Sequence, residues 1–159
     1  MICSIIAGGL SVKNIDDFIG TKIGVNYTFK HLDVDINFGL DKVIGEDRTI
    51  PNLHSLDHHG NTNLVKAWKV KGLDFNRDGK HLIQANNSGI AAINLAIQLG
   101  YKTIYVLGMD NKLTDPSHFY ANRITSTRLT DQYNLMFQKV NERIGNCSLL
   151  EDERLIFVD

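Results

Sequence analysis

The sequence of 159 residues has few cysteines, few prolines and no long apolar run. Its two cysteines, Cys3 and Cys147, lie far apart, so we expect two reduced thiols of a cytoplasmic protein rather than a disulfide. No apolar run approaches the roughly 20 residues that a helix needs to cross a bilayer, so we expect no membrane association. The apolar residues 1–6 have no basic flank and are interpreted as a strand, not as a signal peptide.

An excess of charge of one sign is also missing. The chain has 17 Lys and Arg against 18 Asp and Glu, a net charge of −1, and no arginine-rich stripe. This balance gives no general attraction to nucleic acid, so we expect no nucleic-acid partner. Hydrophobic residues make up 43% of the chain, enough for the core of a single domain of residues 1–159.

The first half of the chain contains three short apolar runs, which predict strands over 3–7, 22–26 and 35–41. A weakly amphipathic piece that ends near Phe18 predicts a short helix after the first strand. Residues 42–80 form a loop-rich excursion, in which only the part from Leu64 to Val70 has a pattern that fits a helix or a strand. Such an excursion is usually a functional lid or a poorly ordered segment, and local signals do not choose between them.

The second half has stronger patterns. The expected elements are a strand at 81–85, a buried helix from 90 that Gly100 closes, a strand at 102–108, a helix at 128–143 and a strand at 155–158. Alternating strands and helices of this kind predict a single Rossmann-like α/β domain, with a mostly parallel sheet and helices on both faces.

Ligands of open α/β sheets bind at the carboxyl ends of the strands, near the point where the strand order reverses. Three groups of candidate residues follow strands or precede a helix there. They are Gly8, Gly9 and Ser11 after the first strand, the turn Asn87, Ser88 and Gly89 before the buried helix, and Asp41 and Asp110 at the ends of two other strands.

The turn at residues 87–89 has the most direct physical argument. Free N–H groups and the helix dipole make a helix N-terminus an anion site, although Asn87 or Ser88 could act only as a cap. The Gly8-Gly9 turn is neither a Walker loop nor the three-glycine dinucleotide fingerprint. A tight connection would explain both of these glycines without a ligand.

Several carboxylates have more than one interpretation. Asp33-Val34-Asp35 has the Asp-x-Asp form that metal-dependent glycosyltransferases use, but it precedes a strand and would point away from the expected site. Asp41 and Asp110 could hold a ribose hydroxyl or, through water, a magnesium ion. They could also simply close loops.

The histidines fall into two groups. His54, Asp57, His58 and His59 are enough ligands for zinc but lack a recognised spacing, so a solvated loop is favoured. His118 follows the Asp110 strand among aromatic residues, where a histidine can serve as a general base.

Four segments together resemble the bacterial family 42 sialyltransferases and the related archaeal 6-hydroxymethylpterin diphosphokinase family. The opening Ser4–Val12 is similar to their first strand and glycine turn, and Gly24-Val25-Asn26 to their second strand. The segment from Asn87 to Asp110 resembles their Ser-Gly turn, alanine-rich helix and strand ending in Gly-Met-Asp, and the tail at 144–148 is similar to their closing strand.

The resemblance implies functions for these turns. In the sialyltransferases the glycine and Ser-Gly turns hold a cytidine monophosphate donor, which implies nucleotide contacts at Gly8, Gly9, Asn26, Ser88 and Gly89. A histidine in a Ser-His-Tyr context is their general base and resembles His118. The diphosphokinases bind ATP with magnesium. Leu10 in place of the turn proline, Phe119 in place of the tyrosine and the short chain, which lacks a lid, are departures from the pattern.

Three functions therefore remain open from the sequence. The first is a glycosyltransferase-like enzyme of viral or phage type that uses a nucleotide-activated donor, with His118 and Asp110 as catalytic residues. The second is a magnesium- and ATP-dependent diphosphokinase-type phosphotransferase, with Asp41 as a weak metal candidate. The third is a non-catalytic binding or interaction module. A homo-oligomer could complete a site that lacks its own lid.

Overall fold

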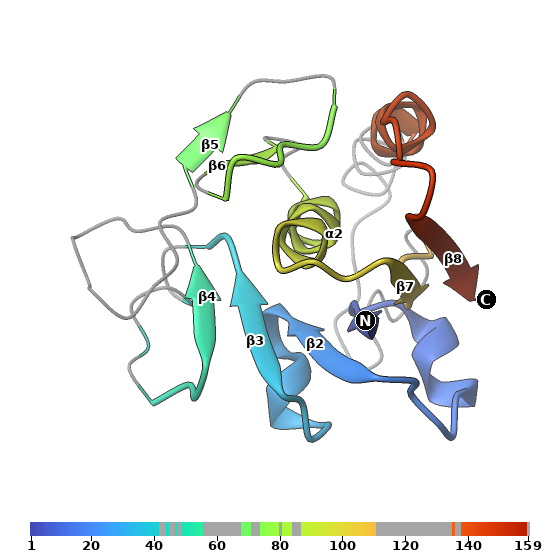
Figure 1. Cartoon of the computed structure of the whole chain (residues 1–159). Coiled ribbons are helices and arrows are strands. Elements are labelled where there is room, and N and C mark those ends of the chain that lie inside the picture. The colour runs from blue at the N-terminus through green and yellow to red at the C-terminus, as the bar shows by residue number, and fades with distance from the viewer. Residues whose placement is uncertain are drawn as a thin grey trace.

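A six-stranded parallel sheet forms the centre of the computed structural model (Figure 1), which describes residues 1–41, 44, 47, 49–55, 68–70, 74–79, 81–83, 87–110, 135 and 138–158. The strand order is β4-β3-β2-β1-β7-β8. The strands are β1 (Ile2–Ile6), β2 (Thr21–Val25), β3 (Ile36–Gly39), β4 (Leu53–Ser55), β7 (Thr103–Leu107) and β8 (Arg154–Val158). The predicted α/β class with a parallel sheet is confirmed.

The central strands are covered on both faces, which is why they read as continuous apolar runs. In β1, Cys3 and Ile5 face one side and are fully buried in the main core cluster. Ile6 faces the other side and packs with Val12 and Leu107. Neither cysteine forms a disulfide, and burial raises the pKa of the Cys3 thiol to about 12.

The helix α2 (Ser88–Gln98) covers one face of the sheet (Figure 1). Its residues 89–97 are all buried, as the dense apolar pattern predicts. It ends before Gly100, whose φ of +84° favours glycine and fits the predicted cap. The helical residues 138–145 pack into the same core cluster through Val140. Among the described residues, no helix is long and apolar enough to cross a membrane.

The opposite face of the sheet carries two short 3₁₀ helices, η1 (Leu10–Asn14) and η2 (Asn26–Lys30). The predicted helix after the first strand is therefore only five residues long and stops well before Phe18. Val12 is the residue of η1 that is buried in the core cluster on this face. Phe18 packs against the same cluster from the extended chain that follows η1. One buried position does not supply the stripe that a longer helix needs.

Three predictions about strands need correction. The predicted strand at 81–85 forms β6 (His81–Ile83), which lies outside the main sheet and pairs in parallel with β5 (Trp68–Val70). Its Leu82 is buried in the core cluster that includes α2, so its apolar signal comes from packing on the helix.

β4 was not predicted. The tail at 144–148 ends a helix and continues as a turn, so the closing strand is β8 instead.

A polar cluster fastens the loop at 74–79 to the turn that precedes β8. Arg77 forms an ion pair with the buried carboxylate of Glu153 and also donates to the carbonyl of Ser148, at 3.3 Å. The backbone N–H of Leu150 donates to Glu153 at 2.9 Å. Asp74 accepts hydrogen bonds from both the N–H and the hydroxyl of Ser148, and the hydroxyl contact lowers the pKa of Asp74.

The same loop is bound to α2 by amide groups. Asn94, which is fully buried, donates to the carbonyl of Asn76 at 2.6 Å and accepts from its N–H at 3.1 Å. Gln98 donates to the same carbonyl at 3.0 Å. The loop therefore joins the C-terminal half of α2 to the start of β8, at the edge of the sheet opposite the predicted ligand site.

Candidate functional site

The strand order reverses between β1 and β7. The chain runs outward from β1 through β2 and β3 to β4, and returns through α2 to place β7 on the other side of β1. In open α/β sheets, the crevice above such a reversal is where ligands bind. The turns that follow β1 and β7 lie at this point of the sheet and contain Gly8, Gly9 and Asp110.

The two turns are bonded to each other. The N–H of Gly9 donates to the carbonyl of Gly108 at 2.6 Å. Asp110 accepts from the N–H of Ser11 at 3.1 Å, and the Ser11 hydroxyl donates to its second carboxylate oxygen. The structure thus brings Gly9 and Ser11 together with Asp110, and Ser11 and Asp110 are 99 positions apart in the sequence.

Close approach explains why glycine occupies two of these positions. A Cβ on Gly9 would lie 2.5 Å from the carboxyl carbon of Asp110 and would collide with the carbonyl oxygen of Gly108. Gly108 has a φ of +67°, and a Cβ there would lie 2.8 Å from the carbonyl oxygen of Ala7. Both glycines are therefore required by the contact between the turns, whether or not a ligand binds.

The N-terminus of α2 lies against the same loops. A Cβ on Gly89 would lie 2.9 Å from the sulfur of Met109, so the helix start touches the turn after β7. Asn87 is the N-cap, and its side-chain oxygen accepts from the N–H groups of Gly89 and Ile90 at 2.8 and 3.2 Å. Ser88 is the first helical residue and is not the cap. Asn87 thus occupies the donors that an anion would use.

Asn26 lies at the end of β2 in the left-handed region, with φ of +56°, a conformation that asparagine tolerates better than most residues. Its side-chain oxygen is buried, has no hydrogen-bond partner among the described residues, and lies against Gly39 at the end of β3. The hydroxyl of Thr28 donates to the carbonyl of Ile6 or Val25, at 3.2 and 2.8 Å, and fixes η2 at this edge. Asn26 therefore carries an unused acceptor at the carboxyl edge.

The remaining carboxylates divide between the two edges of the sheet. Asp41 is exposed just after β3, on the predicted edge. Asp33 and Asp35 precede β3 and bind Lys22, the first through its side chain at 3.5 Å and the second through its N–H at 2.8 Å. The Asp-x-Asp pair is therefore on the opposite edge, as its sequence position predicts. No group of three or more His, Cys, Asp or Glu side chains that could hold a metal occurs among the described residues.

The histidine predictions are only partly covered by the structure. His118, Asp57, His58 and His59 lie outside the described residues. His54 is described, and the solvated-loop interpretation is wrong for it, because it lies on the edge strand β4 with its Nδ1 atom buried. Partial burial, which removes water from the ring, lowers the pKa of His54.

Stability should depend on pH through His54. Because its pKa is lower in the folded state, the unfolded chain binds the proton more readily, so the contribution is complete above the ordinary pKa and is lost as the pH falls below it. We expect the free energy of unfolding to decrease on acidification below about pH 6.5, with a slope of at most about 1.4 kcal/mol per pH unit from this group. Urea unfolding at several pH values checks this.

His54→Phe, which cannot take up a proton, should remove this part of the pH dependence. The matched control is His31→Phe, at an exposed position. If His54→Phe keeps the full slope of the wild type, the half-buried His54 is not its source.

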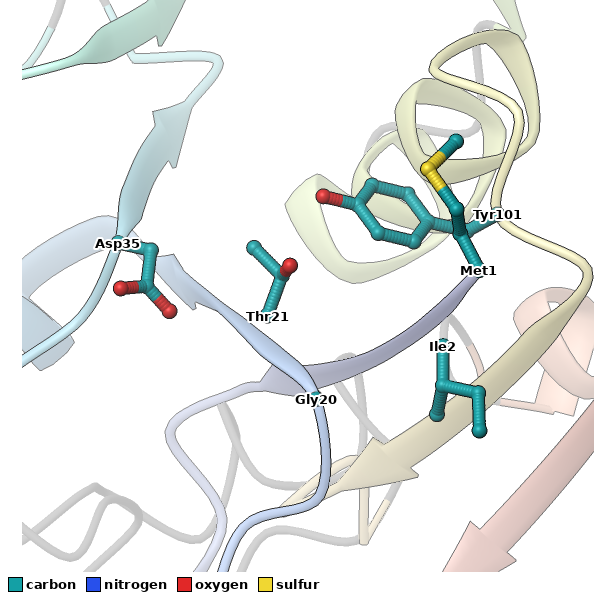
Figure 2. A pocket seen from close by; sticks show the side chains of 6 residues that line it. All are labelled: Met1, Ile2, Gly20, Thr21, Asp35 and Tyr101. Atoms are coloured by element: carbon teal, nitrogen blue, oxygen red, sulfur yellow. The ribbon is translucent and has the colours of Figure 1, made fainter.

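A separate pocket lies at the amino edge of the sheet. It has a volume of about 730 Å³ and is lined by Met1, Ile2, Gly20, Thr21, Asp35 and Tyr101 (Figure 2). No site was expected here from the sequence, because the lining residues come from the starts of three strands and the turn after α2. The positive φ of Gly20, +74°, marks only a tight turn.

Comparison with known proteins finds no matching family model, no similar curated protein and no similar solved structure. The family resemblance of the four sequence segments therefore stays a prediction, and we infer function from the geometry of this chain.

Proposed function

We propose that this chain binds the phosphate of a nucleotide or nucleotide-sugar in the crevice between β1 and β7. The observation that carries the proposal is that the turn after β7 touches both other candidate turns. Asp110 is bonded to Ser11, and Met109 lies against Gly89. Three glycine-containing loops thus meet where the strand order reverses, which is the usual place for such ligands.

The proposed binding is an exchange of acceptors. Without a ligand, the oxygen of Asn87 satisfies two N–H groups at the start of α2. A phosphate would take over these donors and gain the favourable end of the helix dipole. Asn87 is neutral and can turn outward to water, so this exchange leaves no buried charge behind.

Asp110 bears on the reaction that follows. Its carboxylate lies at the Ser11 N–H, so it would repel a phosphate bound at the same turn unless a proton or cation lies between them. In a glycosyltransferase, His118 would take a proton from the acceptor hydroxyl, and α2 would stabilise the leaving phosphate. The charge of Asp110 also favours a second candidate, a phosphotransferase in which magnesium links the nucleotide to this edge.

Asn87→Asp tests the exchange directly. Aspartate caps a helix about as well as asparagine, so the fold should keep its stability. Its charge should repel a phosphate at α2, and we expect the affinity for the best-bound nucleotide to fall about tenfold or more, the effect of about 1.4 kcal/mol. Calorimetric titration with cytidine monophosphate, uridine monophosphate and ATP, each with and without magnesium, measures this.

Asn141→Asp is the matched control, because it adds the same charge at an exposed helical position remote in sequence from α2. It should leave nucleotide affinity unchanged. Equal affinity in wild type and Asn87→Asp would remove α2 from the site. Magnesium-dependent binding of ATP alone would favour the phosphotransferase over the glycosyltransferase.

A further inference from the structure

We propose that the outer edge of β8 pairs with the β8 edge of a second copy of this chain, in the antiparallel direction, so that one sheet runs through a symmetric dimer. β8 is the last strand of the sheet and lies next to β7 (Figure 1). Its outer side has no strand partner among the described residues. This inference does not rest on the proposed nucleotide site, so the two proposals fail separately.

The backbone of β8 offers hydrogen bonds on its outer side. The N–H of Arg154 donates to the carbonyl of Lys102 at 2.7 Å, so Arg154 bonds toward β7. Successive residues of a strand direct their backbone groups to alternate sides. Leu155 and Phe157 therefore direct their N–H and C=O groups away from β7. An unpaired row of this kind is a template for another strand.

The side chains of β8 do not protect this edge. Natural sheets protect an edge with a short strand, charged residues, proline or a covering element. Residues 155–158 are all apolar. The side chains of Ile156 and Phe157, which point to opposite faces of the sheet, are 37% and 47% exposed. Both faces of the edge thus present apolar surface, which a neighbouring strand with the same pattern would cover.

The other edge strand of the sheet is built differently. β4 has only three residues, of which His54 and Ser55 are polar, and Pro51 lies just before it. A short, polar strand beside a proline is the form that natural edges take to avoid pairing with another chain. We therefore place the interface at β8 and not at β4.

A second β8 fits this edge because the strand is complementary to its own reversed copy. Two strands of Arg154–Val158 overlap fully only when Ile156 lies opposite Ile156 of the second copy. In that register Leu155 lies opposite Phe157, and these two outward-directed residues exchange backbone hydrogen bonds. Apolar side chains then meet on both faces of the joined sheet, which stabilises the pairing.

Charge favours the antiparallel direction. β8 begins with the exposed Arg154, and Asp159 follows β8 in the sequence. Reversed strands bring the basic start of one copy beside the acidic end of the other, whereas parallel strands would place like charges side by side. The reversal also directs the carboxyl edges of the two sheets to opposite sides of the dimer, so each copy keeps its own nucleotide site.

Sedimentation of the wild-type protein tests for the dimer. Over concentrations of about 1 μM to 1 mM, the span of moderate to weak dissociation constants, the average mass should rise from that of one chain toward that of two. Phe157→Lys places a charge in the apolar edge and should weaken the dimer about tenfold or more. Ile19→Lys is the matched control, because Ile19 is 51% exposed and lies outside β8, and it should leave the dimer unchanged.

Cysteine cross-linking tests the register. Facing Cα atoms of a pair without mutual hydrogen bonds lie about 4.5 Å apart, so Ile156→Cys should form a disulfide between two copies under mild oxidation. Val158→Cys should not, because Val158 lies about 13 Å along the strand from its counterpart in the second copy. The wild type, with Cys3 and Cys147, gives the background.

Three results would overturn the proposal. They are a wild-type chain that stays monomeric over this whole range, equal weakening by Phe157→Lys and Ile19→Lys, or cross-linking of Val158→Cys as readily as of Ile156→Cys. The first of these results would assign the edge to a partner of another sequence or to none. If Phe157→Lys fails to fold, sedimentation of the wild type and the two cysteine variants still decide.

Discussion

Gly9→Ala is expected to destabilise the protein by about 2–3 kcal/mol, the cost of forcing extra volume into a packed site. The added Cβ would lie 2.5 Å from the carboxyl carbon of Asp110, and the other collision is with the backbone of Gly108, which cannot turn aside. The hydrogen bond from Gly9 to Gly108 and the contact of Asp110 with Ser11 would both be strained. Urea unfolding measures the loss.

Gly145→Ala is the matched control. Nothing lies within 4 Å of a Cβ at this position, and the residue is helical. Alanine there should leave stability unchanged or raise it by up to about 1 kcal/mol. If the two alanine variants are equally stable, the turns after β1 and β7 are not in the close contact described above. The proposed site would then lack the contact between turns on which it is based.

Arg77→Met is expected to cost about 3 kcal/mol or more. The side chain of Glu153 is only 3% exposed, and removing Arg77 leaves its charge with the N–H of Leu150 and with Lys102 at 3.9 Å. A buried charge that loses its partner is strongly destabilising. Chemical denaturation should show a lower midpoint with an unchanged slope, because the surface exposed on unfolding stays the same.

Lys22→Met provides the comparison for a surface pair. The partner of Lys22, Asp33, has a fully exposed side chain, and exposed pairs contribute about 0–1 kcal/mol. A loss in Arg77→Met no larger than that in Lys22→Met would mean that the ion pair of Arg77 with Glu153 does not fasten the loop at 74–79 to the turn before β8.

Much of the fold was predictable from the sequence because buried parallel strands leave continuous apolar runs. This is why β1, β2, β3, β7 and β8 were predicted close to their observed positions. A continuous apolar run indicates that a strand is buried, but it does not identify the element against which the strand packs. The strand His81–Ile83 shows that burial alone does not place a strand in the main sheet. It pairs with β5 in a separate sheet, and its Leu82 is buried against α2.

Short polar elements left no usable pattern. β4 has three residues, Leu53, His54 and Ser55, and two of them are polar types that usually predict a loop. Its place is set by pairing with β3 and by the cluster of Ile44, Ile50 and Leu53, which the chain forms only when folded. The partial burial of His54 follows from that pairing, so the lowering of its pKa could not be foreseen.

The candidate site was predictable in part, since the carboxyl ends of neighbouring parallel strands always meet at one edge. That rule brings together the turns of Gly9 and Asp110. The Asn87 turn follows β6, which lies outside the main sheet, and it reaches this edge because the start of α2 lies against Met109. The rule does not say that Asn87 rather than Ser88 caps α2, nor that Asp110 binds Ser11. The pocket beside Tyr101 was beyond reach, because ordinary residues become a pocket only when three strand starts lie side by side.

The most direct test of the central proposal is to map amide chemical shifts while a nucleotide is added to the wild-type protein. The proposal predicts saturable shifts at Gly9, Ser11, Gly89 and Ile90, whose N–H groups lie in the turn after β1 and at the start of α2. Shifts that leave these four amides unmoved at saturation, or no binding of any nucleotide at millimolar concentration, would contradict it.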